Sequence, residues 1–123
     1  MKILVIDDEA DIRSVSRMSL ERVGGWTVLL AESGERGLEL AESEQPDAIL
    51  LDVMMPDMDG AATIQRLKES PATRQIPVCF LTAKVQASDR ERYRRLGGEG
   101  LISKPFNPMT LPEEVGSILG WEP

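Results

Sequence analysis

The stretch that decides the fold is Ile3-Leu4-Val5-Ile6-Asp7-Asp8, an apolar run that ends in two acids. A second stretch, Ala48-Ile49-Leu50-Leu51-Asp52, has the same form. A continuously apolar run of this length is typical of a strand buried on both faces of a parallel sheet. If the two runs are neighbouring parallel strands, Asp7, Asp8 and Asp52 emerge at the same carboxyl edge of the sheet, where open α/β folds place their sites.

Short strand-like runs alternate with longer amphipathic segments along the whole chain. We predict strands at Lys2–Ile6, Trp26–Ala31, Ala48–Leu51, Val78–Leu81 and Gly100–Ser103. We predict helices at Ile12–Val23, Gly34–Glu44, Ala61–Glu69, Asp89–Leu96 and Leu111–Leu119. This alternation predicts an α/β fold with a parallel sheet covered on both faces. The first and third runs are the most apolar and belong in the centre, whereas polar residues in the second and fifth favour the edges.

Residues typical of helix ends support these boundaries. Ser33 is suited to be an N-cap, and two later segments fit the capping box, Ser88-Asp89-Arg90-Glu91 and Thr110-Leu111-Pro112-Glu113. The pairs Gly24-Gly25 and Gly97-Gly98 are suited to end the first and fourth helices, because glycine readily takes the left-handed conformation.

Length and composition limit the class of protein. The chain has 123 residues, the size of one domain, so we expect a single domain over residues 1–123 and no output domain. Its net charge of −7 argues against direct binding to nucleic acid, which would be repelled. We find no signal segment, and no run approaches the roughly 20 apolar residues that cross a bilayer. We therefore expect a cytoplasmic protein that does not insert into membranes.

Two features allow a structural or a functional interpretation. The arginines at positions 90, 92, 94 and 95 are interleaved with Asp89, Glu91 and Tyr93, which is typical of a solvated helix face but also fits a docking surface for a partner protein. Cys79 is the only cysteine and lies in an apolar run. Because the chain has no histidine to act as its base, we predict a buried, inert thiol.

The three acids at the predicted sheet edge have no basic neighbour in the sequence. Close carboxylates repel one another, so the cluster needs a cation or must partly protonate. Mg²⁺ suits it best, because this ion is usually held by one or two carboxylates with waters and a phosphoryl oxygen. Thr82 follows the fourth strand and Lys104 follows the fifth, so a hydroxyl and an ammonium reach the same edge. This set of groups fits phosphoryl transfer to a carboxylate.

Four motifs, in this order, resemble the receiver domain of two-component response regulators. They are Ile3–Glu9, Asp52–Gly60, Leu81–Ala83 and Ser103–Phe106, and the resemblance covers nearly the whole chain. It implies a flavodoxin-like (βα)5 fold, doubly wound, with a parallel five-stranded sheet of order 2-1-3-4-5. With no output domain expected, the chain is either a stand-alone module like a chemotaxis receiver or a fragment excised from a longer protein.

The resemblance implies a role for each acid. Asp52 would be the phosphoacceptor, taking a phosphoryl group from a histidine kinase, a histidine phosphotransfer protein or a small phosphodonor. Asp8 would bind Mg²⁺ directly, Asp7 through water, Asp52 through its carboxylate and Met54 through its backbone carbonyl, with Mn²⁺ able to substitute. The product would be an aspartyl phosphate, and the chain would catalyse only its own phosphorylation and dephosphorylation.

The resemblance also assigns the switch. Lys104 would balance charge on the phosphoryl oxygens, Thr82 would bind one of them, and the Lys104–Pro105 peptide bond would be cis. The sequence departs from the family at Leu101, where receivers usually carry Tyr or Phe. Because leucine offers neither a hydroxyl nor the same ring area, we expect a weaker conformational change beyond Thr82.

The implied partners are a sensor kinase or phosphotransfer protein and an unknown downstream protein, with the chain a monomer or weak homodimer. Three alternatives compete with this interpretation. A scaffolding pseudo-receiver would lose part of the acid, threonine and lysine set, which is complete here. An aspartyl-phosphate phosphatase of the haloacid dehalogenase type would need an acid where Met54 stands. A flavodoxin-type cofactor binder would need a phosphate-binding loop in place of Asp7-Asp8-Glu9.

Overall fold

The chain folds around one parallel sheet. The computed structural model describes residues 1–55, 59–83 and 86–121. Its sheet has five strands in the order β2-β1-β3-β4-β5, which confirms the predicted topology. The strands are β1 (Lys2–Ile6), β2 (Thr27–Ala31), β3 (Ala48–Asp52), β4 (Val78–Thr82) and β5 (Gly100–Ser103).

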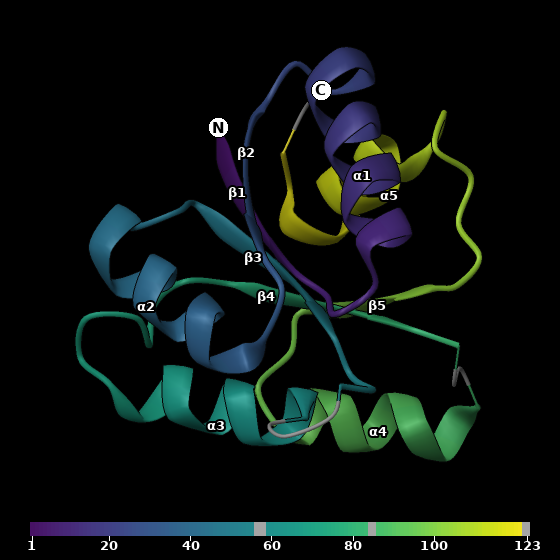
Figure 1. Ribbon diagram of the computed structural model, residues 1–123. Coiled ribbons are helices and arrows are strands. Elements are labelled where there is room, and N and C mark those ends of the chain that lie inside the picture. Colours follow the sequence, from purple (N-terminus) through teal and green to yellow (C-terminus); the bar gives the residue numbers. More distant parts are fainter. Residues whose placement is uncertain (56–58, 84–85, 122–123) are drawn as a thin grey trace.

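Helices cover both faces of this sheet (Figure 1). One face carries α1 (Ala10–Met18), the π-helical turn η1 (Ser19–Val23) and α5 (Leu111–Leu119). The other face carries α2 (Gly34–Glu44), α3 (Gly60–Glu69) and α4 (Ala87–Arg95). In the described part of the chain, no helix is both long and apolar enough to cross a membrane.

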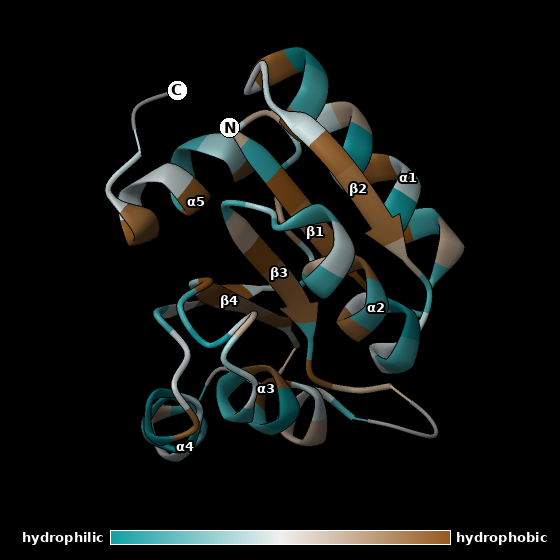
Figure 2. Ribbon diagram, turned by 90° about the vertical axis from the view of Figure 1, so that its left-hand side faces the viewer, coloured by the Kyte–Doolittle hydropathy of each residue, from teal (hydrophilic) through white to brown (hydrophobic). Residues whose placement is uncertain are grey.

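The sheet separates two apolar cores. Leu4 and Ile6 of β1 face the core under α2, α3 and α4, whereas Ile3 and Val5 face the core under α1 and α5. All four side chains are buried, so the central strand is apolar on both faces, as its sequence predicts. Figure 2 shows the strands as largely hydrophobic and α4 as mostly hydrophilic. Cys79 is buried in the second core, and burial raises the pKa of its thiol to about 12, as expected of an inert residue.

The first helix differs from the prediction of one α-helix over Ile12–Val23. It begins at Ala10 and changes into a π-helix at Ser19, where the N–H of Gly24 donates to the carbonyl of Ser19, 3.2 Å away and five residues earlier. The Ser19 hydroxyl donates to the carbonyl of Pro108. This contact with a segment distant in sequence has no local signal, which is why periodicity alone predicts an uninterrupted helix.

The predicted N-cap is confirmed at α2, whereas the two predicted capping boxes are wrong. Ser33 caps α2 as expected, accepting a hydrogen bond from the N–H of Arg36 at 3.1 Å. The capping box at Ser88 is wrong, because α4 begins at Ala87 and places Ser88 inside the helix. Thr110 precedes α5 but does not cap it. Its backbone is helical rather than extended, and its hydroxyl donates backward to the carbonyl of Asn107 at 3.3 Å.

The register of the strands brings the predicted site together. Ile6 of β1 pairs with Leu51 of β3, so Asp7 and Asp52 follow at the same level of neighbouring strands. Thr82 ends β4, one residue after the partner of Asp52. The segment after β5 is held alongside, because the N–H of Lys104 donates to the carbonyl of Thr82 at 2.8 Å.

Candidate functional site

Three carboxylates meet at the carboxyl edge of the sheet. Asp7 follows β1 and is fully buried, Asp52 ends β3 and is 2% exposed, and Asp8 is exposed to solvent. One oxygen from each lies within 4.8 Å of the others. The structure thus brings together the three acids that the two strand motifs predict.

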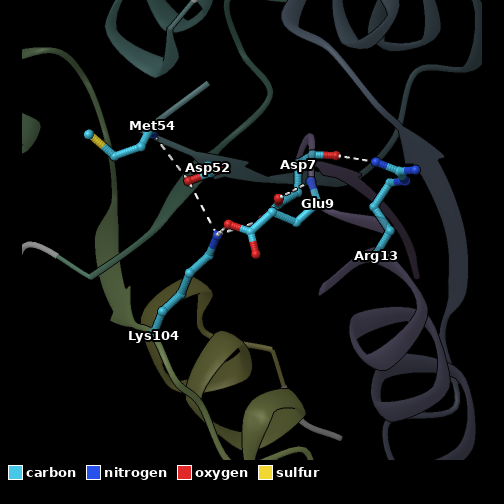
Figure 3. Close-up of polar contacts among 6 residues, drawn as sticks. All are labelled: Asp7, Glu9, Arg13, Asp52, Met54 and Lys104. Atoms are coloured by element: carbon cyan, nitrogen blue, oxygen red, sulfur yellow. Dashed lines mark hydrogen bonds and ion pairs between the residues drawn. The ribbon is translucent and has the colours of Figure 1, made fainter. Parts of the chain in front are cut away.

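The Lys104 ammonium lies between two of these acids (Figure 3). Its Nζ is 2.9 Å from Asp7 Oδ2 and 3.4 Å from Asp52 Oδ1, with Glu9 Oε1 at 3.9 Å. Lys104 therefore balances part of the negative charge of the acid cluster. Burial alone would lower the pKa of Lys104, but the hydrogen bond and charge of Asp7, with the charges of Asp52 and Glu9, raise it above its usual value. The ammonium stays protonated.

The two carboxylate oxygens of Asp52 differ in their surroundings. Oδ1 accepts a hydrogen bond from the N–H of Met54 at 3.1 Å and lies near Lys104. Oδ2 is buried and accepts no hydrogen bond from any residue that the structure describes. A buried carboxylate oxygen without a donor is costly, so this atom is suited to bind a cation or to react.

Burial and a neighbouring negative charge raise the pKa of Asp52 toward neutral pH. Burial raises its pKa from 3.8 to about 6, and the charge of Asp7 adds to the rise. The nearby Lys104 and the N–H of Met54 oppose it without cancelling it. A raised pKa is the direction that burial and repulsion between neighbouring carboxylates predict.

The turn after β1 has its own hydrogen bonds. The N–H of Glu9 donates to Asp7 Oδ1 at 2.9 Å, and Arg13 Nη1 donates to the backbone carbonyl of Asp7 at 2.8 Å. Figure 3 shows the Arg13 guanidinium reaching this carbonyl from α1, on the side away from Asp52. The motif includes Glu9, but no sequence signal marked Arg13, whose contact depends on the helix folding back over the strand end.

The remaining predicted residues lie where the motifs place them. Thr82 is buried at the end of β4, Met54 is 57% exposed, and the Lys104–Pro105 peptide bond is cis.

Leu101 is half-buried on β5 and lines a small hollow with Tyr93 of α4. Tyr93 is itself buried with its ring 5.0 Å from that of Phe80, and sequence analysis missed it as a core residue. Residues 56–58 of the third-strand motif lie outside the described residues.

The family model of the response regulator receiver domain matches residues 3–116, most of the chain. The chain belongs to the receiver domain family. Receiver domains act with histidine kinases and downstream targets. The match spans all four motifs, including the acids, Thr82 and Lys104, and confirms the family that those motifs resemble.

Known relatives agree with this assignment. The alkaline phosphatase synthesis transcriptional regulatory protein PhoP of Bacillus subtilis is 39% identical over 96% of this chain and 48% of its own length. Vibrio cholerae chemotaxis protein CheY4 has a similar structure, with a TM-score of 0.89, 28% identity and coverage of 95% and 97% of the two chains. The N-terminal domain of a Methanoculleus marisnigri response regulator is 41% identical, with a TM-score of 0.79 and 98% coverage of each chain. The receiver spans about half the length of PhoP.

The site of this receiver domain has the donor set of a metal centre. The acids supply only oxygen atoms, which hard divalent cations prefer. The uncontacted Oδ2 of Asp52 gives a direct place for such an ion, and the exposed Asp8 reaches the cluster from the solvent side. The three acids could therefore hold a metal ion.

We predict that Asp52 makes the metal-free receiver less stable as pH rises. Between 3.8 and about 6 the folded chain binds more protons than the unfolded chain, so the free energy of unfolding falls through this window. Asp52→Asn removes this penalty. In a chelating buffer the variant should be more stable than the wild type at about pH 8, and its advantage should shrink toward about pH 4. Urea unfolding at each pH measures this, and a variant that is less stable at the higher pH would contradict it.

Proposed function

We propose that this receiver is a phosphorylatable module of a two-component phosphorelay. Asp52 accepts a phosphoryl group in a Mg²⁺-dependent reaction, and the modified chain changes conformation to alter partner binding. The observation that carries the proposal is the Asp52 carboxylate, which has one buried oxygen without a hydrogen bond while Lys104 lies 3.4 Å from the other. Membership in the receiver family supports it.

In the proposed reaction the Asp52 carboxylate attacks the phosphorus of a phosphohistidine on a sensor kinase or phosphotransfer protein, or of a small acyl phosphate. A P–O bond to Asp52 forms, and the bond to the donor breaks with its electron pair leaving on the donor. With a pKa of about 6, Asp52 is mostly ionised at neutral pH and is a competent nucleophile. The reaction needs positioning and charge compensation rather than a separate base.

Each neighbour has a defined task in this proposal. Asp8, Asp52 and the carbonyl of Met54 would hold Mg²⁺ directly and Asp7 would hold it through water, with Mn²⁺ as a substitute. The bound ion supplies compensation for the charge on the phosphoryl oxygens. Lys104 already lies between Asp7 and Asp52, so a short movement places its ammonium on a phosphoryl oxygen. Thr82, at the end of the next strand, would donate to another.

The alternative functions fit less well. A haloacid dehalogenase-type phosphatase needs a second acid two residues after its nucleophile, and Met54 occupies that position with an exposed, uncharged side chain. A scaffold would not need the pairing of the buried Asp52 with Lys104. We therefore propose that the chain is not an enzyme toward other substrates, that it acts in the cytoplasm on protein partners, and that it binds no nucleic acid directly.

Intact mass after incubation with acetyl phosphate and Mg²⁺ tests the proposed function. The wild type should gain one phosphoryl group, and Asp52→Asn should gain none because it lacks the nucleophile. Asp47→Asn is the matched control, since Asp47 precedes the same strand that Asp52 ends and its carboxylate binds the N–H of Lys2 far from the site. Labelling of Asp52→Asn, or none of the wild type, would contradict the proposal.

A second prediction concerns how far the conformational change extends from Thr82. Leu101 packs against the core as an aliphatic side chain, so it cannot exchange a buried ring for an exposed one. Binding of beryllofluoride, a phosphoryl mimic, should shift NMR signals strongly at Thr82 and Ala83 and weakly at Leu101 and α5, because a ligand shifts populations only through differential interaction with the two states.

Leu101→Tyr should extend the response to position 101 and to α5. Shifts in the wild type that are as large at Leu101 and α5 as at Thr82 and Ala83 would contradict this prediction. The expected response continues to residue 87, but residues 84 and 85 lie outside those the structure describes.

A further inference from the structure

Arg13 contacts a part of the site to which the proposed chemistry gives no role. It lies at the start of α1, with a half-buried side chain, and its own N–H donates to the carbonyl of Glu9 at 3.1 Å. Its Nη1 donates to the backbone carbonyl of Asp7 at 2.8 Å (Figure 3). The guanidinium therefore binds the backbone between the two adjacent acids rather than a carboxylate.

That carbonyl belongs to the peptide group that joins Asp7 to Asp8. Because a peptide group is planar, a bond that holds its oxygen also fixes the nitrogen of Asp8 and the direction in which the chain enters that residue. The next peptide group is held as well, since the N–H of Glu9 donates to Asp7 Oδ1 at 2.9 Å. Both peptide groups that flank Asp8 are thus restrained.

Asp8 depends on these restraints more than its neighbour does. Asp7 is fully buried and its carboxylate is 2.9 Å from Lys104, so packing and an ion pair orient it. Asp8 is exposed, and its position relative to Asp52 follows mainly from the backbone that carries it. A carboxylate that binds a cation directly must be held in place before the cation arrives.

We propose that Arg13 is a positioning residue for the metal site. By holding the Asp7 carbonyl, it fixes the peptide group that orients the Asp8 carboxylate toward Asp52, and so raises the affinity of the site for Mg²⁺. The inference rests on the proposed function, because it assumes that the acid cluster binds this ion.

The sign of the effect separates positioning from the two simpler roles of Arg13. As a nearby positive charge alone, Arg13 would repel Mg²⁺, so its removal would tighten binding. As a purely structural residue that satisfies a carbonyl, it would affect folding stability and leave Mg²⁺ affinity unchanged. Only a positioning role predicts weaker Mg²⁺ binding in a chain that remains folded.

The test compares Arg13→Met with Arg17→Met by calorimetric titration of the full chain with MgCl₂. Methionine has nearly the helix propensity of arginine, so α1 should be preserved. Arg17 is the matched control, because it lies one turn further along α1 and pairs with Glu21 at 3.4 Å instead of the site. The Kd for Mg²⁺ should rise about 10-fold in Arg13→Met, as removal of a residue that orients a metal ligand does, and stay unchanged in Arg17→Met.

A second readout follows the backbone itself. In metal-free protein the amide NMR signals of Asp8 and Glu9 should shift in Arg13→Met and not in Arg17→Met. Arg13→Lys keeps the charge but offers a point-like ammonium in place of the planar guanidinium, so its Mg²⁺ affinity should lie between those of the wild type and Arg13→Met. If Arg13→Met does not fold, weaker Mg²⁺ binding in folded Arg13→Lys supports the proposal and unchanged binding overturns it.

The failures of the two proposals are distinguishable. Unchanged or tighter Mg²⁺ binding in folded Arg13→Met, beside a wild type that binds the ion, overturns the role of Arg13 and leaves the proposed function standing. A wild type that binds no Mg²⁺ overturns both.

Discussion

The Lys104 ammonium joins the ends of two central strands, and the geometry of the site depends on this bridge. Asp7 and Asp52 are buried side by side, and two buried carboxylates without a cation would be strongly unfavourable. Lys104 reaches both because its backbone is bonded to the end of β4. One ammonium does not balance three acids, however. The residual negative charge, the raised pKa of Asp52 and its uncontacted oxygen all give the site a reason to bind a divalent cation.

The fold was largely predictable from the sequence because its determinants are local. Apolar runs buried on both faces mark the central strands, and the apolar period between them marks the helices. The exceptions are equally physical. The π-helical turn at Ser19 involves a hydroxyl bonded to Pro108, which is remote in sequence. The capping box at Thr110 fails because the backbone there is helical, a property that the side-chain pattern does not encode.

The candidate site was predictable to the extent that strand ends determine it. Parallel strands carry their last residues to one edge, so the strand motifs alone suffice to place Asp7, Asp8 and Asp52 together. The sequence does not show which basic side chains contact these acids and their backbone. The bridge from Lys104 to Asp7 and the bond from Arg13 to a backbone carbonyl depend on how a loop and a helix fold over the edge. Such contacts leave no spacing in the sequence to recognise.

We propose that the acid cluster is a cation site whose occupancy is linked to the folded state. The most direct measurement is the free energy of unfolding as a function of Mg²⁺ concentration. A ligand that binds only the folded chain must stabilise it, by about 2.7 kcal/mol at 100 times its Kd. We expect this gain in the wild type, with a larger loss of it in Asp8→Ala than in Asp7→Ala. A wild type that gains no stability at saturating Mg²⁺ would contradict the account.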